Sequence, residues 1–151
     1  MNSVIRPAVV DDVPAILALI RELAMYEREP ATTVEASEDG LRAALFGAHP
    51  AVWAHVAELD GRVVGTAIWF VTFSTWTGRH GMHLEDFVVS EAARGTGLGV
   101  ALFEELRRIC VERGYPRLEW RVLDWNVDAQ GFYERRGAKP IPEWISWRVT
   151  P

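Results

Sequence analysis

The sequence lacks the features that mark exported, membrane-bound and nucleic-acid-binding proteins. Its only cysteine, Cys110, excludes an internal disulfide, and the helical apolar pattern around it indicates a small buried side chain rather than a nucleophile. Residues 1–10 lack the apolar run of a signal peptide, and no segment approaches the roughly 18 consecutive apolar residues of a membrane span. We therefore expect a cytoplasmic protein that does not bind membranes.

Positive charge is not clustered anywhere in the chain. The formal net charge is −5 and no run is rich in Lys or Arg, whereas binding to nucleic-acid phosphates needs clustered positive charge. We therefore expect no nucleic-acid partner. The acidic balance would suit a cationic ligand, although a modest negative charge also simply keeps a protein soluble.

The composition is that of one folded domain. Of the 151 residues, 49% are hydrophobic and 25% are charged, and there is no internal repeat, low-complexity segment or linker. We expect a single domain, residues 1–151, around one core. Seven tryptophans are unusual for this length. We expect most of them in the core or at its rim, with one or two available to line a cleft.

The hydrophobic periods predict an α+β, or mixed α/β, fold with a largely antiparallel sheet that enters a βαβ crossover. Asp60-Gly61 predicts a hairpin turn, and Asp11 or Asp12 and then Ser37 are expected to cap the first two helices. Strands are predicted at residues 4–7, 52–59, 63–73, 82–89 and 118–123, with one or two more within 141–149. Helices are predicted from 13 to near 26–28, and at 38–46, 98–113 and 129–136.

One stretch combines a buried strand, a glycine-rich turn and the start of a helix. Its turn reads Arg94-Gly95-Thr96-Gly97-Leu98-Gly99. Backbone N–H groups at a helix N-terminus bind phosphate, because unpaired donors and the positive end of the helix dipole both favour an anion. A plain strand-to-helix turn needs glycine only for its positive φ angle. Three alternating glycines after an arginine exceed that need and favour an anion site.

This hexapeptide fits the R/Q-x-x-G-x-G/A signature of the GCN5-related N-acetyltransferases (GNAT), and the element order matches theirs. The resemblance covers nearly the whole chain and is most similar to the diamine acetyltransferase branch, which includes spermidine/spermine and thialysine acetyltransferases. It implies a twisted, mostly antiparallel sheet of six to seven strands with four helices. The stretches that carry the branch resemblance are residues 19–27, 74–79, 84–87, 123–126 and 132–138.

By this resemblance the anion is the pyrophosphate of acetyl-coenzyme A, held by the amides from Arg94 to Gly99. The strands at 82–89 and 118–123 would splay apart, and the pantetheine arm would lie between them. A backbone amide near Val88 would polarise the thioester carbonyl. Asn126 would bind the pantetheine, although Asn is also a good helix N-cap. The remaining cofactor contacts implied are Phe87, Val89 and Tyr133.

The resemblance also implies the catalytic pair. An alkylamine with a pKa near 10.4 is almost wholly ammonium at neutral pH, so it must lose a proton before it attacks a thioester. Glu85 matches the family's base, acting directly or through water. Tyr133 matches the acid that protonates the departing thiolate. Outside this resemblance, Glu85-Asp86 would read as a solvated acidic pair and Tyr133 as a buried helix aromatic.

Residues matching the acceptor site combine carboxylates with aromatic rings, which suit a cation through charge pairing and cation–π attraction. They are Tyr26, Glu27, Trp76, Glu85 and Asp86. Trp76, in the connection at 74–81, could equally be a loop aromatic that covers the core. His83 reads as an ordinary strand histidine rather than a second base. No metal site is expected.

The chain departs from the longer family members in two places. It has only the Asp60-Gly61 turn where they carry an insertion, and it stops at Pro151 where they continue into a region that contributes to a homodimer. We expect a homodimer, with the far end of the amine pocket in doubt. Residues 74–76 and 123–126 favour a thialysine-like, lysine-like or short diamine acceptor. The alternatives are another amine, such as an antibiotic or a protein N-terminus, or a sensor of acetyl-coenzyme A. Glu85 and Tyr133 count against the sensor, which needs neither base nor acid.

Overall fold

The computed structural model describes residues 1–151 as two compact units, residues 1–120 and residues 121–151. The first unit holds a five-stranded sheet and three α-helices, and the second holds the fourth α-helix and the C-terminal segment. No helix combines the length and the apolar character needed to cross a membrane.

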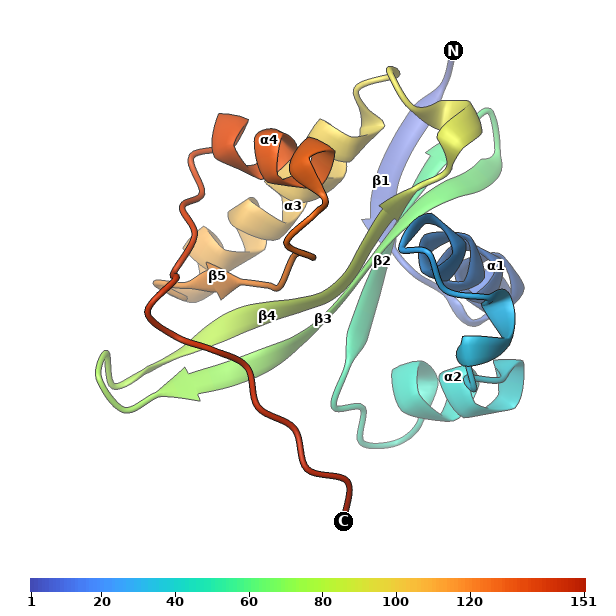
Figure 1. The fold of residues 1–151 in the computed structure, drawn as a ribbon. Helices are drawn as coiled ribbons and strands as arrows, with labels where there is room; N and C mark the ends of the chain where they lie inside the picture. The colour runs from blue at the N-terminus through green and yellow to red at the C-terminus, as the bar shows by residue number, and fades with distance from the viewer. The chain divides into compact units, whose positions relative to one another are not determined.

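The sheet of the first unit has the strand order β1-β2-β3-β4-β5 (Figure 1). The first four strands pair antiparallel, and β5 pairs parallel with β4. Both residues of the predicted Asp60-Gly61 turn have positive φ angles, as a two-residue hairpin requires. The strands are β1 (Ser3–Pro7), β2 (Trp53–Leu59), β3 (Arg62–Ser74), β4 (Arg79–Val89) and β5 (Leu118–Glu119).

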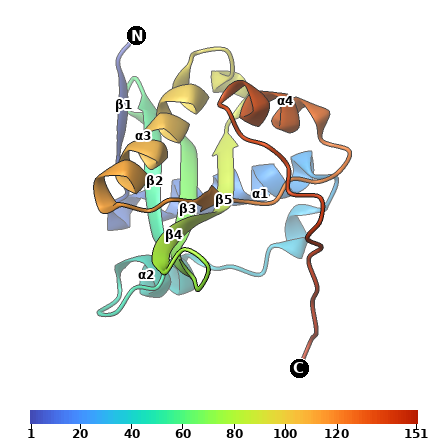
Figure 2. The ribbon, with the colours of Figure 1, turned by 90° about the vertical axis from the view of Figure 1, so that its left-hand side faces the viewer.

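Helices cover both faces of this sheet (Figures 1 and 2). Helices α1 (Val13–Tyr26) and α2 (Glu38–Phe46) lie on one face, and α3 (Leu98–Arg113) lies on the other. Strand side chains alternate between two apolar cores. The core under α1 and α2 contains Ile16, Leu45, Ala54, Val56 and Ile68. The core under α3 contains Ala67, Trp69, Met82, Leu84, Leu102, Leu106, Ile109 and Cys110.

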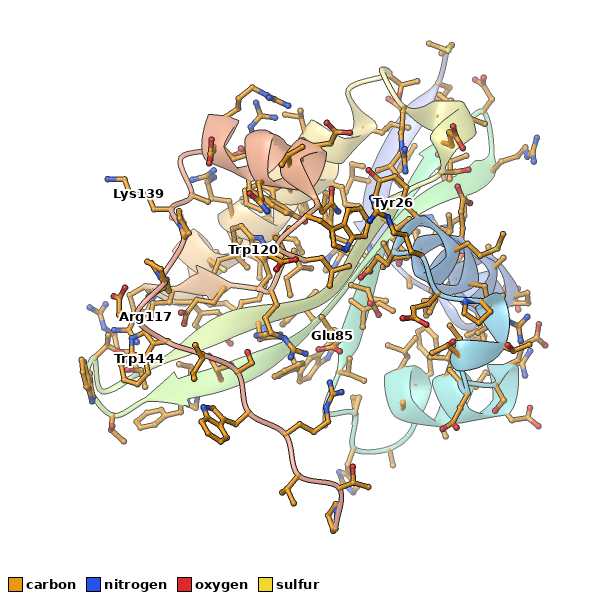
Figure 3. All side chains as sticks on the ribbon, viewed as in Figure 1. Tyr26, Glu85, Arg117, Trp120, Lys139 and Trp144 are labelled. Atoms are coloured by element: carbon orange, nitrogen blue, oxygen red, sulfur yellow. The ribbon has the colours of Figure 1, made fainter.

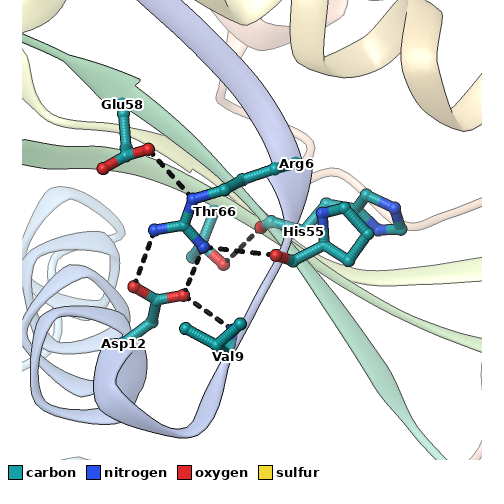
Figure 4. Close-up of polar contacts among 7 residues, drawn as sticks. Arg6, Val9, Asp12, His55, Glu58 and Thr66 are labelled. Atoms are coloured by element: carbon teal, nitrogen blue, oxygen red, sulfur yellow. Dashed lines mark hydrogen bonds and ion pairs between the residues drawn. The ribbon is translucent and has the colours of Figure 1, made fainter. Parts of the chain in front are cut away.

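The start of α1 is fixed by an ion-pair network (Figure 4). Asp12 was one of two residues expected to cap α1, the other being Asp11, but its side chain makes no cap there. Its carboxylate instead accepts hydrogen bonds from Arg6 at 2.7 and 3.0 Å and from the Val9 N–H at 2.8 Å. Arg6 also donates to Glu58 at 2.9 Å, so the network joins β1, β2 and α1. Beside it, the buried Thr66 hydroxyl donates to the His55 carbonyl.

The other helix caps follow the sequence more closely. The Ser37 hydroxyl accepts from the Gly40 N–H at 3.0 Å at the start of α2. In the second unit, α4 (Val127–Arg135) begins two residues earlier than expected, and the Asn126 side chain caps it. The prediction of four helices is therefore confirmed.

The number of strands was predicted wrongly: the sheet has five, not six to seven. Strand β5 ends at Glu119 instead of continuing to residue 123. Residues 141–149 form no strand, because Pro140 and Pro142 lack the N–H groups that a sheet ladder needs. The apolar alternation there leaves Trp147, for example, 87% exposed. The β3–β4 connection is also shorter than predicted, since β4 begins at Arg79.

Asp12→Asn should lower the free energy of unfolding at pH 7 by about 2 kcal/mol, because it weakens charge-assisted hydrogen bonds. Arg6 lowers the pKa of Asp12, so the charged carboxylate stabilises the fold above the pKa of an unfolded aspartate, about 3.9. That contribution is lost as the pH falls through the lower pKa of the folded protein. Chemical denaturation at pH 7 and at pH 3 checks this, and an equal difference between variant and wild type at both pH values would contradict it.

Candidate active site

A β-bulge in β4 arranges the acidic residues. Ile68 of β3 pairs with Asp86 and Trp69 pairs with Leu84, so Glu85 is an extra residue without a partner on β3. In a regular strand, residues 85 and 86 would point to opposite faces, but a bulge sets two successive residues against one. Asp86 lies opposite Ile68, which belongs to the core under α1 and α2. The Glu85 carboxylate is 3.6 Å from His83 Nε2 on the same face.

Three carboxylates act on one another at this point. Burial, and after it the negative charges of Glu85 and Glu27, together raise the pKa of Asp86 to about 6. Glu27 follows the last residue of α1, and partial burial raises its pKa as well. The raised pKa values of Asp86 and Glu27 reflect burial, joined at Asp86 by neighbouring negative charge, with no cation opposing either shift. The site therefore has the electrostatic character that attracts a cationic ligand.

The end of α1 contacts the segment that follows β4. The Glu22 carboxylate accepts hydrogen bonds from the Ser90 hydroxyl at 3.2 Å and from the Glu91 N–H at 3.0 Å. One turn further along α1, the Tyr26 ring lies 4.8 Å below the Arg94 guanidinium. Tyr26 and Glu85 are labelled in Figure 3. Helix α1 thus places the acidic residues next to the glycine-rich turn.

The glycine-rich turn forms an open cradle at the N-terminus of α3. Gly95 and Gly97 have φ angles of +78° and +82°, and a Cβ added to either would meet nothing within 4 Å. The Thr96 hydroxyl donates to the Ala93 carbonyl at 2.5 Å and closes the turn. No side chain caps α3, and its first turn, from Leu98 through Gly99, contains no acidic residue. The first N–H groups of the helix are therefore available to an anion.

The edge of β4 beside this cradle has no partner strand. Strand β5 pairs with β4 only at Met82 and His83, so residues 84–89 are unpaired on that side. On the face of the sheet that α3 covers, Phe87 packs edge-on against Phe103. On the opposite face of the sheet, Val88 is buried. Val89 ends the strand. The free backbone groups of this edge suit an extended ligand that carries amide groups.

The remaining predicted residues belong to other parts of the chain. Tyr133 and Asn126 belong to the unit 121–151, where Tyr133 packs edge-on against Phe132 and Asn126 Oδ1 accepts from the Ala129 N–H at 3.1 Å. The cap occupies the oxygen of Asn126 and leaves its amide NH₂ group to donate. Trp76 lies on the tight β3–β4 turn and is 80% exposed. Six residues of β4 separate that turn from Glu85, about 20 Å along the strand. The structure therefore brings Tyr26, Glu27, Glu85 and Asp86 together but not Trp76.

Sequence reasoning gave no role to Glu22 and read His83 as an ordinary strand histidine, yet both contact the site. Glu22 is one helical turn before Tyr26, and its position within residues 19–27 does not reveal its role, because its partners are a hydroxyl and an N–H far along the chain. The link between His83 and Glu85 follows from their spacing of two in a strand. No cluster of His, Cys, Asp and Glu side chains has an arrangement that could hold a metal ion.

Comparison with known proteins gives the family. The acetyltransferase (GNAT) family model matches residues 16–138. The chain is 36% identical over 151 residues to the thialysine N-epsilon-acetyltransferase of Bos taurus. The alignment covers 95% of this chain and 88% of that protein. It is 29% identical to the L-ornithine N5-acetyltransferase of Arabidopsis thaliana, covering 99% of this chain and 85% of that protein.

Solved structures agree on the fold. An integron cassette protein from the mobile metagenome of V. cholerae superposes with a TM-score of 0.81 at 27% identity, covering 100% of this chain and 94% of that one. A ribosomal-protein-alanine N-acetyltransferase of Brucella melitensis has a TM-score of 0.78 over 99% of each chain, and at 22% identity it shows the fold alone. From the family match and these relatives, the chain belongs to the acetyltransferase (GNAT) family, resembles its diamine acetyltransferase branch, and is an N-acetyltransferase.

Proposed function

We propose that this protein transfers the acetyl group of acetyl-coenzyme A to the primary amine of a small cationic acceptor, by direct attack in a ternary complex. The observation that carries this proposal is the β4 bulge, which turns Glu85 and Asp86 to one face beside Glu27. A base and a cation site are thereby joined to the glycine-rich turn by one strand. The buried Cys110 supports direct attack, because burial raises the pKa of its thiol and disfavours the thiolate that an acyl-enzyme would need.

The residues at the cradle fit acetyl-coenzyme A. Its pyrophosphate would take the N–H groups from Gly95 to Gly99, with Arg94 as a countercharge. The space beside Gly95 and Gly97 and the absence of a side-chain cap on α3 support this assignment. The open edge of β4 at residues 87–89 would hold the amide groups of the pantetheine arm. The Asn126 amide would donate to the same arm.

The chain's own groups then supply proton transfer and charge. Bound acetyl-coenzyme A supplies a thioester that the free amine attacks. The Glu85 carboxylate takes a proton from the ammonium, directly or through one water, while Asp86, Glu27 and the ring of Tyr26 hold the cation. The backbone N–H near Val88 polarises the thioester carbonyl. The Tyr133 hydroxyl donates a proton to the departing sulfur, a role that rests on the family resemblance.

The acceptor we favour is lysine-like or a short diamine. Relatives named for thialysine and for L-ornithine support this choice, since both names denote amino acids with a terminal amine on a short chain. Steady-state kinetics with thialysine, ornithine, diamines, polyamines, an aminoglycoside and an N-terminal peptide tests it. We expect the highest kcat/KM among the first three. Efficient turnover of the aminoglycoside or the peptide alone would replace the assignment.

The proposal extends to the whole chain and its surroundings. We propose one catalytic domain over residues 1–151, because the family match at 16–138 runs through both units. We also propose a cytoplasmic homodimer. Exposed apolar side chains near the C-terminus, among them Ile145, Trp147 and Val149, support the dimer as surface that a second copy would bury.

Glu85→Gln should reduce kcat by about 100-fold or more, because a general base contributes roughly that factor. Raising the pH should recover part of the loss, since more of the amine is then already neutral. Affinity for coenzyme A, measured by calorimetry, should stay unchanged. Glu104→Gln on the solvated face of α3 is the matched control and should keep wild-type kcat. An equal loss of cofactor affinity in Glu85→Gln would mean that Glu85 is structural.

Asp86→Asn should raise the KM for the amine at pH 7 and also raise the thermal midpoint. The pKa of Asp86 is about 6 in the folded protein and about 3.9 in an unfolded chain. The charged Asp86 therefore destabilises the fold increasingly as the pH rises from about 4, and fully above about 6. The stability gain should vanish as the pH falls to 4, and the wild-type KM should rise as the pH falls through 6. Calorimetry and kinetics at both pH values check this, and a variant less stable at pH 7 would contradict it.

Gly97→Ala should weaken binding of acetyl-coenzyme A before it affects the amine KM. An L-residue at its φ of +82° is strained, by about 1–2 kcal/mol, and the new Cβ would enter the cradle. Gly78→Ala is the matched control, because Gly78 also has a positive φ, +66°, and open space, but lies on the β3–β4 turn. Both variants should lose similar stability, and calorimetry should show a raised Kd only for Gly97→Ala. Equal Kd values would place the phosphates elsewhere.

A further inference from the structure

His83 lies behind Glu85 on the same face of β4. Its Nε2 is 3.6 Å from Glu85 Oε2, and its ring stacks on Phe70, the residue directly opposite on β3, with centroids 4.7 Å apart. The His83 side chain is 21% exposed and the Glu85 carboxylate 47% exposed. The imidazole is therefore held by packing yet still reaches water, with one ring nitrogen facing the carboxylate.

The groups nearest His83 are acidic or aromatic, and the cationic Arg117 lies further along the same face, beside Gly81. From its own strand comes Glu85, and Asp86 and Glu27 form an acidic group with Glu85. On the other side, Glu119 of β5 is paired in register with His83, and parallel partners project to the same face. Phe70 contributes no charge. The Arg117 guanidinium donates to Ser74 Oγ at 3.2 Å, at the β3–β4 turn.

We propose that His83 relays to water the proton that Glu85 removes from the acceptor ammonium, a step that rests on the proposed base role of Glu85. The ammonium N–H bond breaks and the proton binds Glu85, which leaves a neutral amine. The carboxylic acid then passes this proton to His83 Nε2, regenerating the carboxylate and forming an imidazolium. The imidazolium releases its Nδ1 proton to water, and the neutral ring returns to the Nδ1–H tautomer by proton exchange with solvent.

The position of His83 explains why the proton would leave Glu85 through the imidazole. An ammonium bound at Glu85 covers the exposed side of the carboxylate, so the second route for the proton lies through the group behind it. The separation of 3.6 Å is longer than a hydrogen bond, but catalytic hydrogen bonds in ligand-free enzymes commonly shorten when substrate binds. Imidazole is also the side chain best suited to exchange protons with water near neutral pH.

His80, a second histidine of β4, provides a control for substitutions at His83. This histidine also packs on the phenylalanine directly opposite, since its ring meets Phe73 edge-on at 5.2 Å. Its Nδ1, however, is 3.1 Å from the Thr72 carbonyl, and four residues of β4 separate it from Glu85. His80 and His83 therefore share a strand, a residue type and an aromatic neighbour, but only His83 contacts the proposed base.

The test compares His83→Ala with His80→Ala for kcat and KM across pH 6 to 9, with and without added imidazole. His83→Ala should lower kcat by about tenfold, less than loss of the base itself, with the amine KM nearly unchanged. Imidazole should restore its kcat in a concentration-dependent manner. His80→Ala should have the kcat and KM of the wild type, and added imidazole should not change its kcat. His83→Gln, which keeps the bulk but cannot carry a proton, should show the same loss if His83→Ala folds poorly.

The outcomes separate the relay from the function on which it rests. Wild-type kcat in His83→Gln, a change confined to KM, or a loss that imidazole does not restore would each overturn the relay. If Glu85→Gln is inactive while His83→Gln is unimpaired, the proposed function stands and the relay fails. If Glu85→Gln itself keeps wild-type turnover, the proposed base fails and the relay fails with it.

Discussion

The site depends on one irregularity in hydrogen bonding, the extra residue that β4 carries opposite β3. Without it, strand alternation would send Glu85 and Asp86 to opposite faces, and one carboxylate would be buried in the core under α3. With it, both join His83 on the face covered by α1, where Glu27 adds a further charge. The raised pKa of Asp86 records the electrostatic cost of this arrangement. Such a cost is typical of sites built to bind or to transfer protons.

Helix α1 is the second element on which the site depends. Its last two turns hold the segment after β4 through Glu22, contact Arg94 through Tyr26, and present Glu27 to Asp86. The other end of the same helix is fixed by the Asp12–Arg6–Glu58 network. A rigid helix anchored at both ends therefore sets the distance between the acidic face and the glycine-rich turn. Groups held this way keep their geometry better than groups on loops.

Local signals in the sequence predicted most of the fold. The Asp60-Gly61 hairpin, the Ser37 cap and the helix that opens after Gly97 were read correctly because each depends on residues that are neighbours in the chain. The errors arose where an outcome depends on distant partners. Residues 141–149 alternate like a strand, but alternation cannot supply a neighbouring edge. Asp12 was expected at a cap, and the distant Arg6 and Glu58 changed its role.

The candidate site shows the same division. The hexapeptide and Glu85-Asp86 could be singled out by pattern and resemblance, whereas the bulge could not, because a bulge is a property of the pairing with β3. Trp76 matched a motif, yet its place on the tight turn follows from where β4 begins. Likewise, His83 looked ordinary until the register placed it between Phe70 and Glu119.

The open edge of β4 has a further consequence, for solubility. Unpaired N–H and C=O groups on a strand offer a template for any extended chain, including another copy of this protein, and such edges promote aggregation. The edge at residues 84–89 is short, is locally twisted by the bulge, and contains the charged residues Glu85 and Asp86. Bulges and charged side chains are the means by which natural sheets discourage edge-to-edge association. The features that we assign to acetyl transfer thus also keep this edge from joining unrelated strands.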